Sequence, residues 1–126
     1  MTLYLKAVIG AATYLIAAEQ IAGVRPTDDL VQDGAIRTLD CRALFGAPAT
    51  APGYRILIEP AAGEPVGLIV DRLDGLAQLA EDRFRALPSI GRFGAAIDAV
   101  CLLAESENPA LRLHVSAALL GAAREL

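Results

Sequence analysis

The sequence is poor in the residues on which nucleic-acid-binding proteins and metalloenzymes usually depend. It has no tryptophan, 5% aromatic residues, one histidine and two cysteines among 126 residues. Nucleic-acid bases stack on aromatic side chains, and a catalytic zinc site commonly uses two or more histidines. The net charge of −4 also repels a phosphate backbone. We therefore expect no nucleic-acid partner and no metal site. The sequence also lacks a motif of catalytic residues, and we expect none.

The two cysteines give little sign of a disulfide framework. Cys41 and Cys101 each lie in an apolar run, where a reduced cysteine behaves as a small buried hydrophobic residue. A disulfide between them is the alternative, but two cysteines have no spacing pattern that would indicate one. Buried free thiols fit a reducing cytoplasm, which is the location we predict.

The sequence is rich in apolar residues, which make up 55% of the chain. A chain of this length forms one domain, here 1–126, with a core of useful size. The surplus of apolar residues predicts that some of them contact a partner protein.

The N-terminal apolar run has two interpretations. Lys6 and the following AVIGAATYLIAA resemble a signal peptide with a cleavage site near Ala17 or Ala18. The run is too short and too interrupted for a membrane span, because Glu19 follows early. Two short strands joined by a turn at Gly10 explain the pattern better, and we expect no direct insertion into a membrane.

Short apolar stretches separated by turn residues predict a mostly β protein with short helices. The strands are expected at 3–9, 14–16, 35–39, 54–58, 66–70, 95–104 and 111–115. Short helices are expected at 40–45, ending before Gly46, and after Ser116. We expect loops at 25–29 and 59–64 and a charged surface segment at 80–85. Many short strands at close spacing favour a small barrel or sandwich.

The most informative segment is VGLIVDRLDGLAQL, from Val66 to Leu79. Val66 to Val70 is rich in β-branched residues and is expected to pair with the strand at 54–58. Asp71 ends the apolar run, and Asp74 with Gly75 indicates a turn, after which 76–79 extends the same sheet. Gly67 in the strand indicates close packing.

Four segments resemble the CheW-like domain, the adaptor module of bacterial chemotaxis. They are LYLKAVIGAATYLIAAEQIAGVRP (Leu3 to Pro26), RTLDCRALFG (Arg37 to Gly46), VGLIVDRLDGL (Val66 to Leu76) and LRLHVSAALL (Leu111 to Leu120). Each segment consists of common residues, but their order and spacing match the family over nearly the whole chain.

The resemblance implies a fold, a set of partners and a binding surface. The fold would be two SH3-like five-stranded β-barrels over a shared core, divided at the linker 47–53 into subdomains of about 1–48 and 53–126 that can exchange strands. The partners would be the regulatory domain of a CheA-like histidine kinase and the cytoplasmic tip of a chemoreceptor. The partner-binding residues would be Ile36, Arg37, Leu39, Arg42, Val66 and Leu68. No cofactor is implied.

The chain departs from the family pattern before the second segment. The interval 26–34 is shorter than the family's loop, and Asp33 replaces an arginine if Gly34 matches the glycine that follows it. The longer loop contributes to receptor and kinase contacts in the family. The chain is therefore a divergent adaptor, a decoy or the partner of a different kinase.

Several charged residues have structural alternatives. Asp40 and Arg42, and likewise Asp71 and Arg72, can form local ion pairs at turns. We expect Arg42→Glu to leave the fold intact and to weaken partner binding, because arginine is common at interface hot spots. His114 stands where the family commonly has aspartate. A small barrel enzyme or ligand binder that uses His114 with a carboxylate is the remaining alternative to an adaptor.

Overall fold

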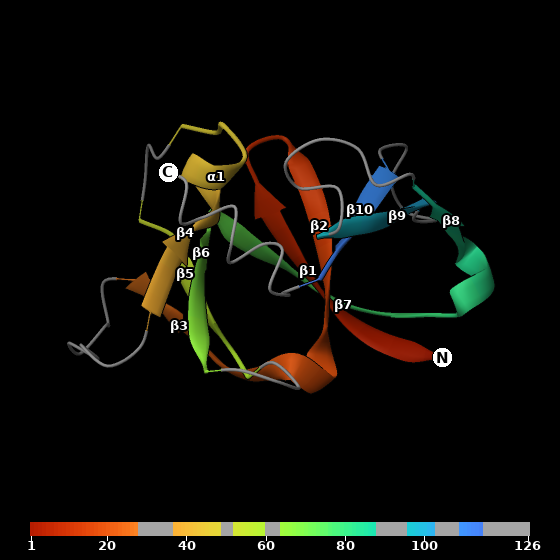
Figure 1. The fold of residues 1–126 in the computed structure, drawn as a ribbon, viewed down its shortest axis with the longest axis horizontal. Coiled ribbons are helices and arrows are strands. Elements are labelled where there is room, and N and C mark those ends of the chain that lie inside the picture. Colours follow the sequence, from red (N-terminus) through yellow and green to blue (C-terminus); the bar gives the residue numbers. More distant parts are fainter. Residues whose placement is uncertain (28–36, 49–51, 60–63, 88–95, 103–108, 115–126) are drawn as a thin grey trace.

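The short apolar strands of this sequence form two β-sheets, which confirms the predicted all-β class with short helices. The computed structural model describes residues 1–27, 37–48, 52–59, 64–87, 96–102 and 109–114. Figure 1 shows a four-stranded sheet on the left and the strands β8 to β10 on the right, with β1 and β2 between them. The predicted helix after Ser116 lies outside the described residues.

The larger sheet has six strands in the order β7-β1-β2-β10-β9-β8. Their bounds are β1 (Thr2–Ile9), β2 (Ala12–Ala17), β7 (Arg72–Leu79), β8 (Phe84–Ala86), β9 (Ile97–Leu102) and β10 (Pro109–Leu113). The predicted N-terminal hairpin is confirmed, with Gly10 in its turn at a φ of 62°. Residues that resemble a signal peptide therefore form two inner strands of this sheet, and cleavage near Ala17 would remove both.

The smaller sheet has four strands in the order β3-β5-β6-β4. Their bounds are β3 (Ile21–Pro26), β4 (Arg37–Asp40), β5 (Tyr54–Ile58) and β6 (Val66–Val70). β5 and β6 are antiparallel, as predicted, whereas β4 runs parallel to β6 at the edge. Arg25 and Pro26, expected in a loop, lie in β3, where an edge strand tolerates proline.

The strand counts differ from the expected five in each barrel. Strands from both halves of the chain enter both sheets, because β1 and β2 lie beside β7 and β10, while β3 and β4 flank β5 and β6. Within the described residues, the outer strands of each sheet do not pair with one another, so neither sheet closes into a barrel there.

The chain crosses from the smaller sheet to the larger one at Asp71, between β6 and β7. Residues 76–79, expected to extend the β5–β6 sheet, instead pair with β1. The expected turn at Asp74 and Gly75 is a bulge within β7, because the register with β1 shifts here and Gly75 has a φ of 92°. The apolar pattern located these strands but did not specify their partners.

In the part of the chain that the structure describes, three short helices join the strands: η1 (Ala18–Gln20), α1 (Cys41–Leu44) and η3 (Glu81–Arg83). α1 confirms the predicted helical piece, and Gly46 follows it with a φ of 72°, a conformation that suits glycine after a helix. Phe84 to Ala86, expected to be only a charged surface segment, forms the edge strand β8.

The main hydrophobic core lies between the two sheets and draws on both. It includes Ile16 from β2, Ile56 and Ile58 from β5, and Leu68 and Val70 from β6, all 0% exposed. Full burial of such a side chain contributes about 1.5–3 kcal/mol to folding. A second, smaller cluster of Tyr4, Leu15, Leu79, Cys101 and Ala110 covers the other face of the larger sheet. The shared core that the resemblance implies is therefore present.

Candidate protein-binding site

Four of the six predicted partner-binding residues lie on two neighbouring strands, β4 and β6, and Arg42 lies in α1. Arg37 lies opposite Val66 and Leu39 lies opposite Leu68, because β4 and β6 are parallel. Arg37 is exposed, whereas Leu39, Val66 and Leu68 are buried in the core. Ile36 lies outside the described residues. The structure therefore brings four of these residues together but exposes one of their side chains.

Among the described residues, β4 is nevertheless an edge strand of the smaller sheet. Its strand neighbour in the described part of the chain is β6, and both Arg37 and Thr38 are exposed. Edge strands have unpaired backbone groups that can bind an extended segment of another protein. This backbone edge, with the Arg37 side chain beside it, is the candidate protein-binding site.

The edge strand leads directly into a partly buried ion-pair network, the Arg42 cluster (Asp40, Arg42 and Asp71). Asp40 caps α1 by accepting a hydrogen bond of 3.0 Å from the backbone N–H of Arg42. The Arg42 Nε and Nη2 donate to the two Asp40 oxygens at 3.0 and 3.1 Å. The Arg42 Nη1 lies 3.5 Å from Asp71 Oδ1. The predicted Asp40–Arg42 ion pair is confirmed.

The Arg42 cluster connects the two sheets. The Asp71 backbone N–H donates to the Val8 carbonyl oxygen at 2.9 Å, and Asp71 Oδ2 accepts a 2.6 Å hydrogen bond from the Gly10 N–H. Asp71 therefore binds the β1–β2 hairpin of one sheet and the arginine beside the other. The Arg42 side chain is only 8% exposed. This burial corrects the expectation that Arg42→Glu leaves the fold intact, while the partner-binding role of Arg42 stays a prediction.

A second network, the Arg112 cluster (Glu81, Asp98, Arg112 and His114), was not predicted from the sequence. Arg112 donates from Nε and Nη2 to the two Asp98 oxygens at 2.9 and 3.0 Å, and from Nη1 to Glu81 at 2.9 and 3.0 Å. Its guanidinium carbon lies 4.5 Å from the centre of the Phe84 ring. These contacts join β10, β9, η3 and β8 on one side of the larger sheet.

Both networks lower the pKa of an aspartate. Burial by itself raises the pKa of Asp98, but hydrogen bonds from Arg112 and His114 outweigh it, and the pKa is lower than in a free aspartate. Burial also raises the pKa of Asp40, but the hydrogen bonds from Arg42 outweigh burial, so the pKa of Asp40 is lowered as well. Both carboxylates therefore stay ionised and paired near neutral pH.

The thiols and the histidine show no activated nucleophile in the described residues. Both cysteines are free and buried, as predicted, and burial raises the pKa of Cys41 to about 12. Burial also raises the pKa of Cys101. His114 Nε2 lies 2.8 Å from Asp98 Oδ2, but Arg112 binds both oxygens of the same carboxylate. His114 therefore contacts a carboxylate that Arg112 already holds.

The described residues contain neither a cluster of metal ligands nor a helix suited to cross a membrane. No group of three or more histidine, cysteine, aspartate or glutamate side chains in this part of the chain could hold a metal ion. Among the helices that the structure describes, none has the length and apolar character needed to cross a membrane.

The fold of two small sheets around one shared core is similar to that of a solved scaffolding protein. The fold is similar to that of the scaffolding protein TtCheW from Thermoanaerobacter tengcongensis, with a TM-score of 0.72 and 12% sequence identity. The match covers 93% of this chain and 91% of that chain. No family model and no curated protein matches the sequence. The predicted resemblance is thus confirmed for the fold.

Proposed function

We propose that this protein is a non-catalytic cytoplasmic adaptor in chemotaxis-type signal transduction. It binds the regulatory domain of a CheA-like histidine kinase and bridges it to the cytoplasmic tip of a chemoreceptor. The observation that carries the proposal is the CheW-like fold, which extends over 93% of the chain. An adaptor of this kind changes the conformation of the kinase by binding and performs no chemistry of its own.

The proposed kinase contact is the open edge of β4. A strand of the kinase domain pairs with the β4 backbone, and Arg37 contacts an acidic side chain beside it. Leu39, Val66 and Leu68 lie beneath this edge and fix its position through the core. Arg42 and Asp40 fix the end of the strand where it enters α1.

The proposed receptor contact is the weaker of the two. The interval 26–34 is short, and Asp33 has the opposite charge to the arginine that the family pattern places there. We therefore propose that the chain binds the kinase more tightly than it binds the receptor.

The test is titration calorimetry against the regulatory domain of each CheA-like kinase in the same genome. We expect a Kd of about 1 μM or less, equivalent to at least about 8 kcal/mol. Arg37→Glu should weaken binding, whereas Arg72→Glu, on an exposed position of the other sheet, should not. A folded wild-type protein that binds none of these domains would contradict the proposal and indicate a decoy or a repurposed module.

The alternative of a His114-dependent enzyme or ligand binder has one observation in its favour, the 2.8 Å contact between His114 and Asp98. We expect His114→Ala to leave kinase binding unchanged, because His114 lies on the larger sheet and the proposed contact lies on the smaller one. A ligand-binding or catalytic activity that disappears in this variant would favour the alternative.

A further inference from the structure

The helix α1 lies where the edge strand β4 of the smaller sheet meets the β1–β2 hairpin of the larger one (Figure 1). α1 begins directly after Asp40, the last residue of β4. The Phe45 ring at its end stacks on the Tyr14 ring of β2, with the ring centroids 5.0 Å apart. A Cβ added to Gly10 in the hairpin turn would lie 3.1 Å from the Ala47 Cβ. One short helix and the residues that follow it therefore join the β4 edge to the hairpin.

A series of charged contacts connects the same two places. Arg42 donates to both oxygens of Asp40, at 3.0 and 3.1 Å, and this two-point contact fixes the two side chains relative to each other. Arg42 Nη1 lies 3.5 Å from one Asp71 oxygen, and the other oxygen accepts the 2.6 Å hydrogen bond from the Gly10 N–H. The Arg42 side chain is buried, so salt screens these contacts less than it screens exposed pairs. A displacement of Asp40 therefore reaches Gly10.

We propose that α1 couples the β4 edge to the β1–β2 hairpin. A partner strand that pairs with β4 shifts Asp40 at the end of that strand. Arg42 and Asp71 then change the hydrogen bond at Gly10. Gly10 lies with Ala11 in the exposed hairpin turn, so binding on the smaller sheet alters a surface of the larger one. Asp71 is a positioning residue in this device, because it acts through the Gly10 amide.

The inference rests on the proposed function, because the partner at β4 is the proposed kinase domain. It adds regulation to that function, since the occupied β4 edge changes the hairpin turn that a second protein can contact. Coupling between two binding sites is reciprocal. A protein that binds the hairpin turn would therefore change the affinity of the β4 edge by the same factor as the kinase domain changes the affinity of the turn.

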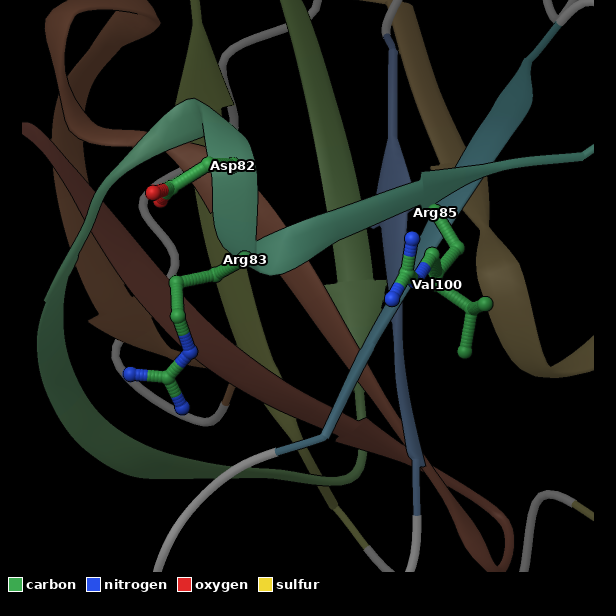
Figure 2. A pocket seen from close by; sticks show the side chains of 4 residues that line it. All are labelled: Asp82, Arg83, Arg85 and Val100. Carbon is green, nitrogen blue, oxygen red and sulfur yellow. The ribbon is translucent and has the colours of Figure 1, made fainter.

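The first test uses the isotope-labelled full chain without a partner. Asp40→Asn weakens the contact with Arg42, and NMR follows the amide of Gly10. We expect this amide signal to shift and its hydrogen exchange to become about fivefold faster. The amide of Val100, which lies opposite Arg85 at the far edge of the larger sheet (Figure 2), should keep its chemical shift and exchange rate.

Two further variants show whether the effect passes through Asp71. Asp71→Asn keeps an oxygen that can accept from Gly10 but loses the charge that binds Arg42. Adding Asp40→Asn to this variant should no longer shift the Gly10 amide. The matched control Asp74→Asn removes the same charge from an exposed position on β7 and should leave the Gly10 amide as in the wild type. An unshifted Gly10 amide in Asp40→Asn, an equal shift with and without Asp71→Asn, or a uniform change over both sheets would overturn the proposal.

The second test adds the regulatory domain of a CheA-like kinase. In the wild type, the Gly10 amide should shift at the same domain concentration as the amides of β4. In Asp71→Asn, the β4 amides should shift and the Gly10 amide should not. Shifts confined to β4 in the wild type would contradict the coupling and leave the kinase contact intact. A wild type that does not bind the domain would contradict the proposed function alone, because the test on the free chain decides the coupling without it.

Discussion

The Arg42 cluster and the Arg112 cluster use the same chemistry in different places. Each puts one poorly exposed arginine between two acidic side chains, with side-chain exposures of 8% for Arg42 and 14% for Arg112. The Arg42 cluster links the two sheets through Asp71, whereas the Arg112 cluster joins neighbouring elements of one sheet. The difference indicates that Arg42 supports the arrangement of the whole fold and Arg112 supports one edge of it.

The surroundings of the two arginines also differ. The carboxylates of Asp40 and Asp71 are 32% and 26% exposed, whereas that of Glu81 is 76% exposed. Water can therefore replace part of the hydrogen bonding that Arg112 gives to Glu81. It has less access to the carboxylates of the Arg42 cluster. Exposed ion pairs contribute about 0–1 kcal/mol, whereas breaking a buried pair costs about 3–5 kcal/mol.

The largest expected effect is that of Arg42→Glu. The substitution places a third carboxylate beside Asp40 and Asp71, so we expect a loss of about 3–5 kcal/mol in the free energy of unfolding. Urea denaturation followed by circular dichroism measures it. The control Arg37→Glu, on the exposed edge strand nearby, should change stability by less than about 0.5 kcal/mol. Equal losses of stability in the two variants would show that Arg42 has no special structural role.

A smaller loss is expected for Arg112→Met, which keeps much of the side-chain volume and removes the charge. Asp98 keeps its contact with His114 and access to water, so we expect a cost of about 1–3 kcal/mol. Hydrogen exchange should increase mainly in β8 and β9 and less in β5 and β6. A uniform increase over both sheets would contradict the local role assigned to the Arg112 cluster.

The glycine that binds Asp71 allows a finer test of the crossing. Gly10 has a φ of 62°, and a Cβ added to it would lie 3.1 Å from the Ala47 Cβ. Gly10→Ala should therefore cost about 1–2 kcal/mol. Gly23→Ala is the matched control, because a Cβ at Gly23 meets no atom within 4 Å and its φ is not in the left-handed region. Thermal unfolding of both variants should show a lower Tm for Gly10→Ala alone.

The smallest effect concerns acid stability. The pKa values of Asp40 and Asp98 are lower in the folded protein than in the unfolded chain, where aspartate has a pKa of about 3.9. Their contribution is therefore present above about pH 4 and disappears as the pH falls through the folded pKa values. Asp98→Asn and Asp40→Asn should each reduce the pH dependence of unfolding in this range. An unchanged slope in both variants would show that neither pairing contributes to acid stability.

The sequence predicted the local features of this protein well. The hairpin around Gly10, the strand pair at 54–58 and 66–70, and the helical piece before Gly46 all depend on residues close together in the chain. The Asp40–Arg42 pair was found for the same reason, since its members are two residues apart. Propensity and turn chemistry act over this range.

The sequence did not predict the pairing of distant segments. Arg112 binds residues 14 and 31 positions away, and Asp71 binds Gly10 from 61 positions away. Such contacts depend on which strands become neighbours, and apolar alternation does not encode that choice. The same limit explains why Leu39 and Leu68 were predicted at a binding surface, although both side chains are buried in the core.

The proposed function requires that this chain hold two partners together, and sedimentation velocity tests that most directly. The chain is mixed with a CheA-like regulatory domain and a chemoreceptor cytoplasmic fragment, each carrying a different fluorophore. We predict one boundary that contains all three proteins. In two-component mixtures, the chain should bind the kinase domain at a lower concentration than it binds the receptor fragment. Kinase domain and receptor fragment that never share a boundary in the presence of the folded chain would contradict the claim.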